Sequence, residues 1–304
     1  MAIITAAVLA ALRTSLRKEF RTGYEGMQPK TFWNTVAMLA PSTSSSNTYD
    51  WLGDFPELTE WVGERVVKDM KENGYQIVNK LFESTVGVKR TAIEDDEAGL
   101  YSNIVLAAGQ SAARFPDQLI ANLLKAGGSS LCYDGQNFFD TDHPVFPNAD
   151  GTGAAATISN MATGAGRPWY LLDCSVEAKP FIFQERTKPE FDTLTDSGQS
   201  DTVFLTDRYL YGTRYRCNAG YGFWQKAYMS TEVLSDDTLD AAIAAMMGFK
   251  GDGDRPLGIS PTHLVVDPTN RATGNKVVKA INRANGESNT NYEAVELIVT
   301  PWLA

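Results

Sequence analysis

A change in the spacing of apolar residues divides the first half of the chain. Residues 81–90, LFESTVGVKR, place their more apolar side chains at a spacing of two, which predicts a half-buried strand. One side of this segment is formed by Phe82, Ser84, Val86 and Val88. Apolar and small residues then recur at steps of three and four, which predicts a helix. These residues are Leu100, Ile104, Ala107, Ala108, Ser111 and Ala112.

The predicted helix runs from Glu94 to Ala113 and is the longest in the sequence. Thr91 and Glu94 have the spacing of a capping box, in which each side chain satisfies a backbone amide at the start of the helix. Phe115-Pro116 predicts an interruption, because the residue before a proline avoids helical dihedral angles. Pro116 can also open a second helix that ends near Gly127. We therefore expect a long, kinked helix.

The N-terminal segment has the pattern of an amphipathic helix. Its apolar residues follow at steps of four: Ile4, Val8, Leu12, Leu16 and Phe20. Its charged residues are mainly basic, with Arg13, Arg17, Lys18, Arg21 and Lys30 against Glu19 and Glu25. A basic arm on an acidic body can dock onto a neighbouring molecule, face a polyanion or pack on its own body, and the sequence leaves these possibilities open.

A hairpin is predicted between the arm and the long helix. Strand patterns at residues 65–70 and 75–88 flank Asn73-Gly74, a strong signal for a two-residue turn. An isolated hairpin is marginally stable in water. Because Trp51 and Trp61 lie near its base, we expect the chain's own body or another copy to cover it.

The second half of the chain combines long strands with separate helices. Residues 180–186 and 209–217 alternate in strand fashion, and the second run puts tyrosines on one face and arginines on the other. Residues 128–168 contain no regular element of length. Helices are expected at 238–249 and 275–285, and strands at 263–266 and 295–299. This order predicts an α+β fold and not an alternating βαβ series.

Composition excludes some functions. With 304 residues, 43% hydrophobic residues and a formal charge of −10, the chain is a folded protein that repels nucleic acid as a whole. Cys132, Cys174 and Cys217 are widely spaced and suit small side chains in a reducing compartment. No stretch is apolar for long enough to span a bilayer, and the N-terminus lacks the leading positive charge of a secretion signal.

Catalysis has little support in the sequence. Asp140, Asp142 and His143 could bind a divalent ion, but with no second cluster of ligands in the chain, turn hydrogen bonds around Pro144 explain the two aspartates better. The sequence contains no GxSxG, HExxH or GxxxxGK[ST] motif. We therefore predict no catalytic, cofactor-binding or metal-binding residues.

Several strings together resemble the major head subunit (major capsid protein) of Mu-like tailed bacteriophages and prophages. They include WLGDFPELTEWVGERV, FESTVGVKRTAIEDDE, CYDGQNFFDTDHPV and YGTRYRCNAGYGFWQKAY, and they occur in order over nearly the entire chain. The resemblance implies the HK97-type capsid fold. That fold has an N-terminal arm, an extended loop, a peripheral domain with a spine helix, and an axial domain.

The resemblance implies a division of the chain. The arm is expected at 1–48, the extended-loop hairpin at 49–90 and the spine helix of the peripheral domain at 91–130. A glycine-rich loop insertion follows at 131–168, the long strands of the peripheral domain at 169–234 and the axial domain at 235–304. The residues expected to contact neighbouring subunits are Trp51, Trp61, Arg65, Phe82, Arg13 and Arg17.

The function that the resemblance implies is structural and not enzymatic. Pentamers and hexamers of the chain would form an icosahedral head around double-stranded DNA held without sequence specificity. Scaffold and maturation protease would be separate chains, with decoration and portal proteins compatible as further partners. The protein would belong to the virion capsid, assembled in the cytoplasm of the bacterial host with no membrane partner. Two alternatives stay open: a metal-dependent hydrolase using Asp140, Asp142 and His143, and an encapsulin-like nanocompartment shell.

Overall fold

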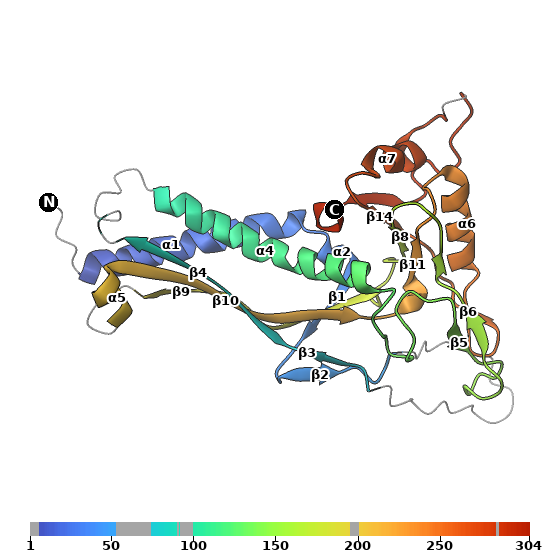
Figure 1. Cartoon of the computed structure of the whole chain (residues 1–304), viewed down its shortest axis with the longest axis horizontal. Coiled ribbons are helices and arrows are strands. Elements are labelled where there is room, and N and C mark those ends of the chain that lie inside the picture. The colour runs from blue at the N-terminus through green and yellow to red at the C-terminus, as the bar shows by residue number, and fades with distance from the viewer. Residues whose placement is uncertain (1–5, 53–73, 90, 92–99, 195–200, 284–285) are drawn as a thin grey trace.

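The molecule is elongated, with two long helices over a sheet at one end and a second sheet with its own helices at the other (Figure 1). The structure is a computed structural model that describes residues 6–52, 74–89, 91, 100–194, 201–283 and 286–304.

The first sheet has four strands in the order β1-β9-β10-β4. These strands are β1 (Ala37–Pro41), β4 (Lys80–Lys89), β9 (Phe181–Leu194) and β10 (Arg208–Tyr221). β1 runs parallel to β9, whereas β10 pairs antiparallel with both β9 and β4. The predicted alternation is confirmed on β10, because its tyrosines and Cys217 are buried while Arg214 is exposed.

Helices α1 (Ala6–Met27) and α4 (Leu100–Ala126) lie side by side over this sheet (Figure 1). Leu16 and Phe20 of α1 are buried with Val105 of α4 and Phe191 of β9, so the predicted apolar stripe of the arm faces the chain's own body. The arm therefore packs on the long helix of the same molecule.

The expected interruption at Pro116 is wrong, because α4 continues through this residue. A proline inside a helix costs about 3 kcal/mol. Tertiary contacts beside the proline offset that cost. The rings of Phe115 and Phe82 pack with their centroids 4.5 Å apart, and Asp117 accepts hydrogen bonds from the backbone amides of residues 32 and 33. The expected capping box at Thr91 and Glu94 falls partly outside the described residues, since residues 92–99 are not described.

The predicted strand at 75–88 is found as two strands, β3 (Gln76–Val78) and β4. β3 pairs with β2 (Ser46–Thr48), and β4 pairs with β10 from Lys80 to Lys89. β4 therefore has a partner strand within its own chain. Its predicted hairpin partner, residues 65–70, lies outside the described residues.

The second sheet has five strands in the order β15-β14-β8-β11-β7. They are β7 (Met161–Ala162), β8 (Trp169–Leu172), β11 (Ala227–Ser230), β14 (His263–Val266) and β15 (Glu296–Val299). β8 and β11 come from the segment expected to form the long peripheral strands, yet they pair with each other, and β8 also pairs with β14. One sheet thus joins strands from before and after residue 235.

Helices α6 (Asp236–Met247) and α7 (Arg271–Lys279) cover one face of this sheet. Trp169 and Leu171 face these helices, while Tyr170 and Leu172 face the main core beneath α4. The helix expected at 275–285 ends at Lys279, because Asn289 donates through Nδ2 to the carbonyls of Val277 and Ala280.

The remaining elements are short. They are η1 (Gln28–Lys30), α2 (Trp33–Val36), β5 (His143–Val145), β6 (Ala156–Ile158), α5 (Asp201–Thr206), η2 (Trp224–Lys226), β12 (Lys250–Gly251), β13 (Arg255–Pro256) and η3 (Pro301–Leu303).

Candidate functional site

Of the three residues of the hydrolase alternative, Asp140 and Asp142 lie together, but the imidazole of His143 contacts Asp134 instead. Asp140 accepts hydrogen bonds from the backbone amides of Asn137 and Thr141, at 3.2 and 2.7 Å. Asp142 is exposed, whereas the ring of His143 is fully buried and its Nδ1 lies 2.7 Å from Asp134. The turn interpretation of Asp140 is therefore the one that matches its hydrogen bonds.

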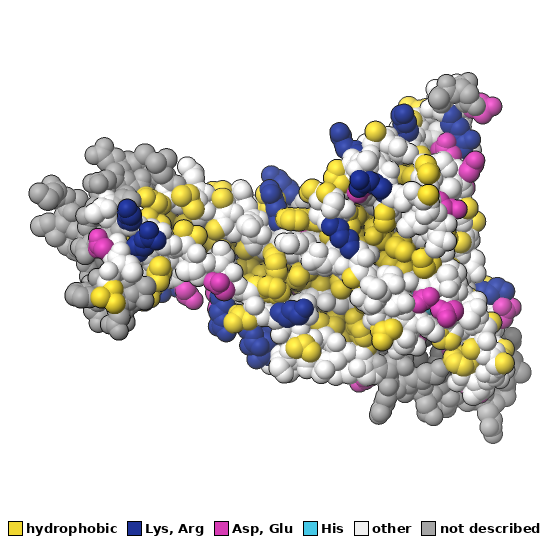
Figure 2. All heavy atoms as spheres, in the orientation of Figure 1, with side chains coloured by type: hydrophobic (Ala, Val, Ile, Leu, Met, Phe, Trp, Pro, Cys, Tyr) yellow, Lys and Arg dark blue, Asp and Glu magenta, His cyan; other side chains and the backbone are white. Residues whose placement is uncertain are grey.

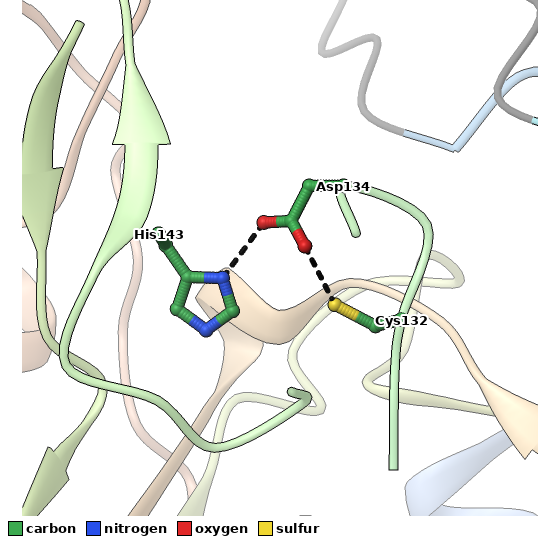
Figure 3. Close-up of side chains that lie close together, drawn as sticks. All are labelled: Cys132, Asp134 and His143. Carbon is green, nitrogen blue, oxygen red and sulfur yellow. Dashed lines mark hydrogen bonds and ion pairs between the residues drawn. The ribbon is translucent and has the colours of Figure 1, made fainter. Parts of the chain in front are cut away.

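His143 belongs instead to a buried group with Cys132 and Asp134 (Figure 3). Asp134 accepts from Cys132 Sγ at 3.0 Å and from His143 Nδ1 at 2.7 Å. It also accepts from the amide of Gln136 at 3.0 Å across Gly135, whose φ of 86° lies in the left-handed region that glycine tolerates. The imidazole of His143 stacks on Trp224 with ring centroids 3.9 Å apart.

Burial and hydrogen bonding compete at Asp134. Burial opposes its ionisation, but the hydrogen bonds from His143 and Cys132 outweigh this and hold the pKa of the Asp134 carboxyl below its ordinary value. Burial and the nearby Asp134 charge raise the pKa of the Cys132 thiol far above its usual range. The thiol is therefore a protonated hydrogen-bond donor and not a nucleophile.

A sulfur, a carboxylate oxygen and an imidazole nitrogen are together a donor set that suits Zn²⁺. In this group, however, the Asp134 carboxylate already accepts a hydrogen bond from each of the other two residues. A metal-bound histidine normally donates its second N–H to an acceptor. If a metal between these three side chains bound His143 Nδ1, then Nε2 would be the nitrogen that donates, but it is buried and has no hydrogen-bond partner among the described residues. The geometry therefore fits a hydrogen-bonded staple that links β5 to the loop before it.

Sequence reasoning missed Cys132 and Asp134 as partners of His143. The available signal was the Asp134-Gly135 pair, a turn sequence that turns an aspartate side chain back onto its own loop. The two strands that bring His143 near this turn, β5 and β6, are too short to stand out in the pattern.

Four of the six residues expected to contact neighbouring subunits lie within the described part of the chain. Trp51 is 40% exposed and packs on Phe223 with ring centroids 5.7 Å apart. Phe82 packs against Phe115 of α4. Arg17 donates to the carbonyl of Phe191 at 3.2 Å.

Arg17 also pairs with Asp192 at 3.5 Å, and Arg13 is exposed on α1. Trp61 and Arg65 lie outside the described residues. The intersubunit role of all six residues stays a prediction.

Large apolar side chains are exposed on several elements. Leu81 and Val86 on β4 are 60% and 46% exposed, and Ile104 on α4 is 52% exposed. Val233 and Ile281, near α6 and α7, are 72% and 67% exposed. Within the part of the chain that is described, no helix has the length and apolar character to cross a membrane.

Comparisons with known proteins agree over the whole chain. A family model described as "Mu-like prophage major head subunit gpT" matches residues 9–303. The major capsid protein of Escherichia phage Mu is 44% identical over 307 residues, covering 99% of this chain and all of that protein.

Solved structures match equally fully. A chain from the procapsid of bacteriophage JBD30 is 51% identical and superposes with a TM-score of 0.86, covering 98% of this chain and 100% of that one. A chain from the JBD30 capsid decorated with minor capsid protein trimers is 37% identical, with a TM-score of 0.77 and full coverage of both chains.

Proposed function

This chain belongs to the Mu-like major head subunit family and is a major capsid protein of a Mu-like phage with the HK97-type fold, and from this we propose how it acts. Copies of the chain form pentamers and hexamers that close into an icosahedral head around double-stranded DNA. The single observation that carries the proposal is the match, over 98% of the chain, to a subunit of the JBD30 procapsid.

The division into arm, extended loop, spine helix, loop insertion, long strands and axial domain belongs to this proposal. We assign α4 to the spine helix and the five-stranded sheet with α6 and α7 to the axial end, because β14, α6 and α7 share one core. Strands β8 and β11, at residues 169–172 and 227–230, join this end in our assignment since they complete the same sheet.

The contacts between subunits are proposed to use residues 49–90 and the arm. Trp51 and Phe82 contribute aromatic surface, and Trp61 and Arg65 lie in the same segment of sequence. Arg13 and Arg17 extend from α1, where a basic side chain can meet the acidic surface of a neighbour.

Enclosing DNA is compatible with the charge of the protein. A formal charge of −10 keeps the shell from adhering to DNA, so the genome is held by enclosure and not by sequence-specific contact. We further propose that the subunit has no catalytic activity, that scaffold and maturation protease are separate chains, and that the head assembles in the host cytoplasm. Decoration by minor capsid protein is proposed by analogy with the decorated JBD30 capsid. A portal protein is proposed as a further partner of the head.

Neither alternative gains support from the comparisons. The matched family and the matched phage Mu protein are head subunits and not hydrolases, and the JBD30 subunit comes from a phage procapsid and not from an enzyme-filled compartment.

Electron microscopy of the expressed chain tests the proposal. We expect shells, tubes or capsomer rings of uniform width when the chain is expressed alone or with the scaffold protein of its phage. A monodisperse monomer at every salt concentration, with and without that scaffold protein, would contradict self-assembly.

A further inference from the structure

Charges are segregated between the two helices that cover the second sheet. Helix α6 and its first turn carry Asp236, Asp237 and Asp240 and no basic residue. Residues 271–283, which comprise α7 and the turn after it, carry no acidic residue. Their basic residues are Arg271, Lys276, Lys279 and Arg283.

Helix dipoles explain only part of this arrangement. Acidic residues are favoured in the first turn of a helix and basic residues in the last, which accounts for Asp236 and Asp237 in α6 and for Lys276 and Lys279 in α7. Asp240 lies beyond the first turn of α6, and Arg271 stands at the wrong end of α7 for its charge. Two oppositely charged surfaces are therefore present for a reason other than helix capping.

The outer face of α6 is exposed along its length. Leu239, Ala242 and Met246 are buried against the sheet, while the opposite side is exposed at steps of three and four residues. The exposed residues are Asp237, Asp240, Ala241, Ala244 and Met247. This acidic face thus combines carboxylates at one end with small side chains and the 57% exposed Met247 at the other.

The basic face also contains apolar side chains. Ile281 follows α7 directly and is 67% exposed, and Tyr292 is 41% exposed. Asn289 donates its backbone amide to the carbonyl of Ile281, which holds the loop that carries Tyr292 beside the end of α7. Each face therefore has apolar surface with a charged border, which is the composition of a protein–protein interface.

The two faces are held in a fixed relation. Arg283 lies 3.6 Å from Asp236, Asn291 donates to the carbonyl of Asp236, and both helices share one core. Figure 2 shows acidic side chains along the right edge of this end of the molecule, where Figure 1 places α6. Basic side chains are visible on the part of the same end that carries α7.

We propose that the acidic face of α6 in one copy binds the basic face of α7, residues 271–283 with Tyr292, in the next copy. Two acidic faces repel each other, as do two basic faces, so the contact joins different surfaces of the two copies. Such a head-to-tail contact closes into a ring when the rotation per subunit permits. The inference rests on the proposed function, and it names the surfaces that give a capsomer its orientation.

Charge and apolar surface have separate roles in this contact. Exposed ion pairs contribute little binding free energy each, so affinity comes mainly from the apolar residues. Opposite charge selects the partner face and its direction, because like charges placed against each other are strongly unfavourable. The charge effect should weaken with salt, since the screening length falls from about 10 Å at 0.1 M to about 3 Å at 1 M.

A charge-swap experiment on the full-length chain tests this contact. One variant is Asp237→Lys with Asp240→Lys, a second is Lys276→Glu with Lys279→Glu, and a third combines all four substitutions. We expect the first two to lower the yield of particles at 0.1 M salt by about tenfold or more, because each places like charges face to face. The combined variant should recover most of the yield, because every contact again joins opposite charges.

Matched controls carry the same charge changes at exposed positions elsewhere. They are Glu177→Lys with Glu190→Lys, and Lys188→Glu with Arg208→Glu. We expect both controls to assemble like the unmodified chain, and restored assembly in the combined variant rules out misfolding of α6 or α7 as the cause of the loss.

The inference is overturned if the combined variant assembles no better than the first two, or if these match their controls. In either case the unmodified chain still forms particles, so the proposed function stands. If the unmodified chain never assembles, the proposed function fails, and this contact fails with it.

Discussion

Asp117 connects two distant parts of the chain through one side chain. Its Oδ1 accepts hydrogen bonds from the backbone amides of Phe32 and Trp33, at 3.0 and 2.9 Å, where α2 begins. The residue is 5% exposed. Burial raises the pKa of the Asp117 carboxyl to about 6, although the two amides and Arg114 oppose the shift.

The raised pKa predicts a dependence of stability on pH. A carboxyl whose folded pKa is above its unfolded value contributes stability that is complete below about pH 4 and lost as the pH rises through about 6. In an Asp117→Asn variant the amide oxygen can accept the same bonds without a charge. Between pH 7 and pH 4 the unmodified chain should therefore gain roughly 2 kcal/mol of unfolding free energy relative to the variant.

Urea unfolding of the soluble subunit at the two pH values measures this difference. Glu177→Gln, at an exposed loop position, is the control and should show a much smaller change. Equal behaviour of the two variants would show that Asp117 does not titrate as a buried group.

The Cys132–Asp134–His143 staple gives a second residue-scale prediction. Asp134→Ala removes the acceptor of three hydrogen bonds and leaves buried donors unpaired, so we expect a loss of about 2–4 kcal/mol. Asp142→Ala, in the same loop but exposed, should change stability by less than about 0.5 kcal/mol. Thermal unfolding of both variants would contradict the assignment if their losses were alike.

At the scale of elements, α1 and α4 contact each other through their backbones. A side chain at Gly109 of α4 would collide with the carbonyl oxygen of Phe20, and one at Gly23 of α1 would collide with that of Leu106. Glycine normally weakens a helix interior, so its presence at both positions reflects this close approach. The close contact fixes α1 along α4 of the same chain.

Gly109→Ala and Gly26→Ala should therefore change stability in opposite directions. The first must push the helices apart, and overpacking of this kind costs about 1–3 kcal/mol. The second meets no atom within 4 Å, and replacing a helical glycine by alanine stabilises by up to about 1 kcal/mol. Chemical unfolding compares the two, with hydrogen exchange along α1 as a second readout. A stabilising Gly109→Ala would mean that the helices are not in close contact.

At the scale of the whole molecule, the second sheet serves two cores. One face of the sheet packs against α6 and α7 and forms the first core. The opposite face packs with Phe181 and Phe183 of β9 in the main core. The two ends of the molecule are therefore joined through shared strands and not through a linker.

Shortening the segment that connects β2 to β3 should block assembly without unfolding the subunit. Tyr49 donates its amide to the carbonyl of Tyr75 at 2.8 Å, so a short Gly-Ser linker can replace residues 53–73 without displacing either strand. We expect a folded subunit that forms no closed particles by electron microscopy, because the proposed extended loop lies in this segment. Trp61→Ala and Arg65→Ala in the full-length loop test the two proposed contact residues. Closed particles from the shortened chain would contradict the role of this loop.

Local periodicity was sufficient for many of the elements. The spacing of two on β4 and β10, the stripe of α1 and the apolar run of β14 each identify an element from neighbouring residues alone. The order of family strings identified the capsid fold, which the full-length matches confirm. The elements depend on side-chain spacing within one segment, and the family on the order of its strings along the chain, so the sequence alone contains the information that both require.

Other features depend on residues that are distant in the sequence. Pro116 stays helical because Phe82 and the start of α2 pack beside it, and His143 finds Asp134 only through the turn at Gly135. The pairing of β8 with β14 joins residues about ninety positions apart. The amino-acid sequence by itself determined which segments are helical or extended and to which family the chain belongs. The tertiary structure alone decided which strands pair, which helix ends persist and which buried polar groups meet, because the free energy of those contacts arises only when distant segments pack together.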